Sequence, residues 1–124
     1  MTARIAAALV VVVAALHVYF LVLEMFLWET PFGMKTFGTT PEIAESSAVL
    51  AANQGLYNGF LAAGLLWALG AYGVVGGRAA LTFFLTCIVV AGVFGAVTAN
   101  PRILFVQALP AALALVLVWR ARGR

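Results

Sequence analysis

The chain has 124 residues, of which 65% are hydrophobic and 9% charged, whereas a soluble domain has roughly 45–50% apolar and about 25% charged residues. This excess excludes an ordinary water-soluble domain and predicts a single membrane domain over residues 1–124. The formal charge of +3 comes mainly from arginines at chain ends and turns, a distribution that argues against nucleic-acid binding. Cys87 is the one cysteine, so an intrachain disulfide is excluded.

Four apolar segments are long enough to be membrane-spanning helices, which need about 20 residues. The first starts like a signal peptide but continues to Trp28, so we expect a retained span. Thr40 and Pro41 are start signals for the second span, and Pro110 should kink the fourth unless a neighbour compensates. The Pro- and Gly-containing segment 29–40 is expected to be a loop. The predicted spans are about residues 5–28, 41–72, 79–98 and 103–119.

Short turns between these spans favour an all-α, antiparallel four-helix bundle. Lys and Arg accumulate on the cytoplasmic side of membrane proteins. We therefore predict that both termini and the turn 73–78 are cytoplasmic, with the segment 29–40 outside. The cytoplasmic side then holds Arg4, Arg78, Arg120, Arg122 and Arg124, against Lys35 and Arg102 on the other side.

Polar side chains gather in what would be the outer half of the membrane. His17 and Glu24 are about two helical turns apart and share a face of the first span. On the second span, the stretch 53–58 supplies two polar pairs at i, i+4 spacing. Titratable groups and amides in hydrocarbon need partners, so we predict a polar pocket between helices that opens to the extracytoplasmic side. The candidate ligand-binding residues are His17, Glu24, Trp28, Asn53, Gln54, Tyr57, Asn58 and Gln107.

A purely structural interpretation of the same residues stays open. Polar groups between membrane helices often serve only as interhelical hydrogen bonds, at roughly 0.6 kcal/mol each. Glu24 would then reach water at the membrane interface. Gly55 and Gly59 form a small-xxx-small step that predicts close helix packing and says nothing about function.

Metal and cofactor chemistry finds little support in the sequence. Met25 and Met34 lie near the outer side, and thioethers are ligands for Cu(I). No second His and no Cys accompanies them in the sequence, so we predict no metal site and no cofactor. No Ser–His–Asp set, phosphate-binding loop or H-E-x-x-H pattern occurs.

Three stretches carry a family resemblance: HVYFLVLEMFLWETPFGMKTFG from His17, LAANQGLYNGFLAAGLLW from Leu50 and NPRILFVQALPAALAL from Asn100. Over nearly the whole chain, the sequence closely resembles the small bacterial membrane proteins grouped as domain of unknown function 1304 (DUF1304). The resemblance implies a four-helix, multi-pass protein of the bacterial plasma (inner) membrane. It implies no activity, substrate or catalytic residue, although every candidate ligand-binding residue falls on these stretches.

Three classes of function follow from the chemistry. We expect first a bundle that binds a small molecule or a lipid in the polar pocket. The alternative is a membrane enzyme for proton transfer of the isomerase type, with His17 or Glu24 as acid or base and with Tyr57 and Asn58 orienting the substrate. The third class is a structural or assembly subunit without a ligand. The expected partners are the lipid bilayer and the ligand, with no nucleic acid, and a homo-oligomer stays open because a transporter of this length would need one.

Overall fold

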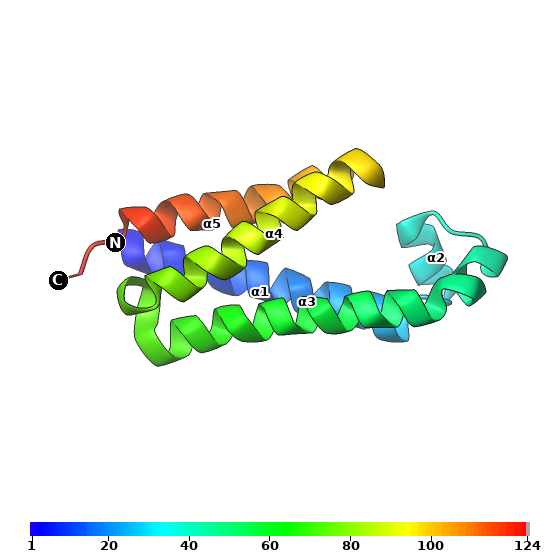
Figure 1. Ribbon diagram of the computed structural model, residues 1–124, viewed down its shortest axis with the longest axis horizontal. Helices are drawn as coiled ribbons and strands as arrows, with labels where there is room; N and C mark the ends of the chain where they lie inside the picture. Colours follow the sequence, from blue (N-terminus) through cyan, green and yellow to red (C-terminus); the bar gives the residue numbers. More distant parts are fainter. Residues whose placement is uncertain (124) are drawn as a thin grey trace. The chain divides into compact units, whose positions relative to one another are not determined.

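The computed structural model describes residues 1–123, and these residues are all-helical with no strand (Figure 1). The predicted all-α class is therefore confirmed. Arg124, which the orientation prediction counts as cytoplasmic, lies outside the described residues. The elements in chain order are α1 (Thr2–Phe26), α2 (Pro31–Phe37), α3 (Pro41–Gly76), α4 (Arg78–Thr98), the π-helical turn η1 (Leu104–Ala108) and α5 (Leu109–Arg120).

Three helices, α1, α3 and α4, are long and apolar enough to cross a membrane, as judged from length and composition. A shorter apolar helical segment, Leu104–Arg120, follows them. These segments indicate a multi-pass membrane protein. The four-helix bundle and its orientation stay predictions.

The chain divides into two compact units, one formed by Met1–Ala15 with Leu61–Arg124 and the other by Leu16–Phe60. Helices α1 and α3 each contribute one part to each unit. We call the first the core unit, because it contains the main cluster of buried apolar side chains. We call the second the polar unit, because it contains most of the candidate site residues.

Close packing of α4 against η1 and α5 forms much of the core unit, where these elements run side by side (Figure 1). Gly92 marks a close approach of α4 to η1, since a Cβ atom there would lie 2.7 Å from the backbone nitrogen of Ala108. Small residues let membrane helices approach and gain van der Waals contact. The fully buried side chains of this cluster include Val10, Val13, Leu65, Leu81, Leu85, Ile88 and Val118.

Pro110 explains why the helical segment 104–120 begins with a π-helical turn. Proline lacks the N–H that an α-helix needs, and its ring collides with the carbonyl group one turn earlier. In the structure, Leu109 N–H donates to the carbonyl of Leu104, five residues back, and Pro110 occupies the first turn of α5. The wider π-turn thus accommodates the proline without ending the segment.

Gly73 interrupts the backbone of α3 near its end. Its φ of 67° and ψ of −177° lie outside the helical region, and this positive φ is readily adopted only by glycine. The Gly73 carbonyl accepts the N–H of Gly77 at 2.9 Å. The chain then turns and begins α4 at Arg78.

The short helix α2 occupies the segment that the sequence analysis expects to be a loop. Thr30 caps its start, because the Oγ1 atom of Thr30 accepts the N–H of Gly33 at 3.1 Å. Pro31 takes the first helical position, and Gly38 ends the helix in the left-handed conformation with φ of 68°. Pro31 and Gly38 therefore mark the start and the end of a short helix, whereas the sequence pattern predicts a loop.

Candidate functional site

Within the polar unit, a hydrogen bond between side chains joins α1 to α3. The Nδ2 atom of Asn58 donates to the Oε2 atom of Glu24 at 2.7 Å. Both residues are half-buried. A carboxylate group accepts several hydrogen bonds, so this contact leaves Glu24 with acceptor capacity for a further donor.

Two glycines on α3 bring its backbone close to the part of α1 that carries Glu24. A Cβ atom at Gly55 would lie 2.6 Å from Cγ of Met25 and 3.1 Å from Cβ of Glu24. A Cβ atom at Gly59 would lie 2.7 Å from Cδ1 of Leu21. The small-xxx-small step thus sets the short separation that allows the Asn58 side chain to reach Glu24.

His17 lies on α1 two helical turns before Glu24 and is nearly inaccessible, with 1% of its surface exposed. Its ring meets the ring of Phe20 edge-to-face, at a centroid distance of 5.3 Å and an interplanar angle of 73°. A buried imidazole is a costly group in an apolar helix and is normally held by specific partners. His17 is therefore a fixed element of α1, not a surface group.

Trp28 connects the turn after α1 to the start of α3. Its Nε1–H points between two acceptors, the Ala44 carbonyl and the Ser47 hydroxyl, at 3.1 Å each. Its ring packs against Phe37 of α2 at a centroid distance of 4.7 Å. These contacts give Trp28 a clear structural role in the polar unit, beside its predicted role in ligand binding.

The other candidate site residues of α3 are more exposed than Asn58. Asn53, Gln54 and Tyr57 are all exposed. The amide of Asn53 donates to the Val49 carbonyl of its own helix at 2.9 Å. The structure thus brings Asn58 to Glu24 but turns the side chain of Asn53 back to its own backbone.

Gln107 belongs to the core unit, where it lies in the π-turn η1 and is half-buried. Within α-helices, single π-turns occur frequently at functional sites. The sequence makes Gln107 a candidate ligand-binding residue, and this role stays a prediction.

Sequence reasoning missed Ser47 as a polar contact. Its hydroxyl donates to the Ile43 carbonyl at 2.6 Å and accepts the indole N–H of Trp28. A tryptophan that is partly buried usually needs an acceptor for its indole N–H, and this need was the signal that could have pointed to Ser47. Among residues 1–123, no three His, Cys, Asp or Glu side chains come together as a metal site.

Comparison with known proteins gives one family match. The model of a family described as "Protein of unknown function (DUF1304)" matches residues 11–119. No curated protein and no solved structure matches the chain.

Proposed function

The chain belongs to the DUF1304 family, and from this premise we propose that it binds a small molecule or a lipid at Glu24 and Asn58. In this proposal the protein is an antiparallel four-helix bundle of the bacterial inner membrane. Both termini lie in the cytoplasm, and the polar unit lies in the outer half of the membrane. Within the polar unit, the lining of the pocket is completed by His17, Trp28, Asn53, Gln54 and Tyr57.

The hydrogen bond from Asn58 to Glu24 is the observation that carries the proposal. A carboxylate among apolar helices costs more free energy than one interhelical hydrogen bond returns. A side chain of Leu or Phe at position 24 would pack in the same place without that cost. The presence of Glu24 therefore favours a ligand that supplies further hydrogen-bond donors, such as a hydroxyl or amino group.

The first test is the identity of whatever purifies with the protein. Organic extracts of the purified wild-type chain should contain a defined small molecule or lipid that mass spectrometry detects in fixed ratio to protein. Glu24→Gln keeps the shape of the side chain but weakens its acceptor strength, so the extract should lose this molecule. Glu29→Gln is the matched control, because Glu29 is exposed in the turn after α1.

Two outcomes would overturn the binding role. One is an extract from Glu24→Gln with the same composition as that of the wild type. The other is a wild-type protein that carries only bulk lipid while Glu24→Gln merely lowers the melting temperature, which would support a structural or assembly subunit instead.

A proton-transfer enzyme is the second candidate, and the buried imidazole of His17 on the same helix as Glu24 favours it. Two titratable groups on one wall suit the removal and return of a proton at one substrate. Incubation of the protein with its extracted ligand in heavy water should then introduce deuterium at a carbon atom. Absence of this exchange in the wild type would contradict the enzyme role and leave ligand binding as the proposed function.

A further inference from the structure

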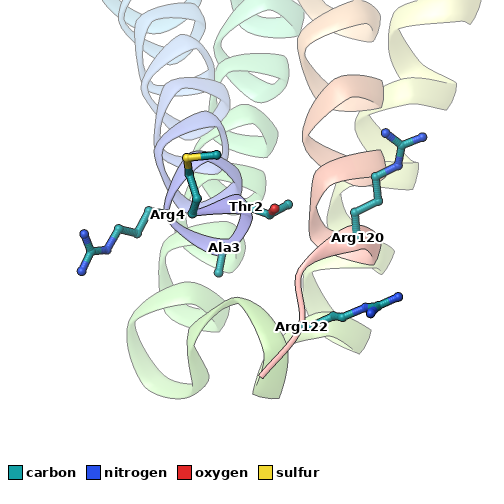
Figure 2. A pocket seen from close by; sticks show the side chains of 6 residues that line it. Thr2, Ala3, Arg4, Arg120 and Arg122 are labelled. Carbon is teal, nitrogen blue, oxygen red and sulfur yellow. The ribbon is translucent and has the colours of Figure 1, made fainter. Parts of the chain in front are cut away.

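A basic hollow lies in the core unit and is lined by residues that the proposed function does not use. It is an open hollow of about 650 Å³ between the start of α1 and the end of α5. Figure 2 shows Thr2 directed toward the α5 side, Arg4 extending from α1 away from α5, and Arg120 and Arg122 extending from the end of α5 away from α1. The lining residues are Met1, Thr2, Ala3, Arg4, Arg120 and Arg122.

The chemistry of this lining suits a phosphate group. Three arginines belong to the lining, with Arg120 and Arg122 on the α5 side and Arg4 directed away from them, and none of the described residues that line the hollow is acidic. Guanidinium groups stay charged and bind phosphate oxygens in a bidentate manner. The hydroxyl of Thr2 adds a donor at the start of α1, where the N–H groups of Arg4 and Ile5 already donate to the Met1 carbonyl.

A hydrogen bond to the backbone between Arg120 and Arg122 holds the segment that carries these two arginines. The guanidinium of Arg78 donates to the carbonyl of Ala121 and lies 5.7 Å from the ring centre of Trp119. Ala121 is buried and leaves the helical conformation, with φ of −67° and ψ of 129°. Arg120 and Arg122 therefore extend from an anchored piece of backbone, which reduces the entropy lost when they hold an anion.

The place of the hollow in the sequence identifies the source of the phosphate. It lies where the apolar helix α1 begins and the apolar helix α5 ends, so a membrane-spanning arrangement puts it at the level of lipid headgroups. Basic pockets at the ends of membrane helices bind anionic headgroups. We propose that this hollow binds the phosphate of an anionic lipid headgroup.

The test uses the full chain in detergent micelles and native mass spectrometry. The wild type should retain phosphatidylglycerol in preference to phosphatidylcholine at equal lipid concentration. Arg120→Gln with Arg122→Gln should lower the apparent affinity for phosphatidylglycerol about tenfold or more, since charge-assisted contacts are lost. Arg102→Gln is the matched control for Arg122→Gln alone, because each removes one exposed arginine of the core unit and Arg102 does not line the hollow.

Equal binding of phosphatidylglycerol by the wild type and the double variant would overturn the proposal. A titration with inorganic phosphate distinguishes the two sources: binding as tight as that of the lipid would overturn the lipid headgroup as occupant. Both arginines are exposed, so the variants should fold, and a helical circular dichroism spectrum checks this. Arg122→Gln alone, beyond the end of α5, serves if the double variant does not fold.

Discussion

Asn58 donates a hydrogen bond of 2.7 Å to Glu24, which joins α3 to α1 inside the polar unit. Asn58→Leu removes the donor while keeping a similar volume, so we expect the free energy of unfolding to fall by about 1–2 kcal/mol. Glu24→Gln keeps an acceptor oxygen and should change it by less. Unfolding in mixed micelles, followed by circular dichroism, measures both values.

The double variant of Asn58→Leu and Glu24→Leu provides the control for this pair. If the two groups interact only with each other, the double variant should recover much of the lost stability, because no unpaired carboxylate remains. Strictly additive losses would show that the hydrogen bond contributes nothing to the stability of the polar unit.

Gly55 tests the close approach of the two helices. Gly55→Ala puts a methyl group 2.6 Å from Cγ of Met25, so we expect a loss of about 1–3 kcal/mol in the free energy of unfolding. Gly70→Ala is the matched control on the same helix, since a Cβ atom there meets nothing within 4 Å. Its better helix propensity should give a gain of up to about 1 kcal/mol.

A Gly55→Ala protein as stable as the Gly70→Ala protein would contradict the observed packing. In that case the separation of α1 and α3 would adjust freely, and the reach from Asn58 to Glu24 would not depend on Gly55. The extract of Gly55→Ala should also contain less of the ligand expected for Glu24, which links the packing to the proposed function.

Trp28 gives a prediction for the part of the polar unit that follows α1. Trp28→Phe keeps an aromatic ring against Phe37 but removes the N–H that Ala44 and Ser47 accept. We expect a loss of about 1 kcal/mol. Ser47→Ala should have a smaller effect, because the Ala44 carbonyl remains as acceptor. Equal losses in the two variants would show that the Ser47 hydroxyl alone stabilises the indole.

The all-α class and the family could be predicted because their signals are strong in a single sequence. Apolar runs long enough for membrane helices admit few other structures. Short elements give weaker signals. Pro31, Gly33 and Gly38 are typical of a loop, yet the structure uses Pro31 and Gly38 to bound α2, and a helix of seven residues has no hydrophobic period to detect. Pro110 predicts a disturbed helix but not its π-helical form.

For the candidate site, counting residues along a helix predicts the depth of a side chain but not the direction in which it points. Helical rise gives the depth of each polar residue, but rotation about the helix axis decides what the side chain faces. Helix α3 is apolar around most of its circumference, so its sequence does not define one inward face. Asn53 and Asn58 illustrate the difference, because one amide bonds its own backbone and the other reaches Glu24. Ligand binding by the eight candidate residues stays a prediction.

Arg78 tests whether the fixed backbone at Ala121 or the net positive charge alone determines lipid binding at the basic hollow. It does not line the hollow, but its guanidinium holds the carbonyl of Ala121 between the two arginines that do. Arg78→Gln should therefore weaken the preference for phosphatidylglycerol by a few-fold, through a less ordered backbone at Ala121. Arg102→Gln removes the same charge from the core unit without touching this segment. If the two variants bind phosphatidylglycerol equally well in native mass spectrometry, then net charge, and not the anchoring of Arg120 and Arg122, determines the lipid preference.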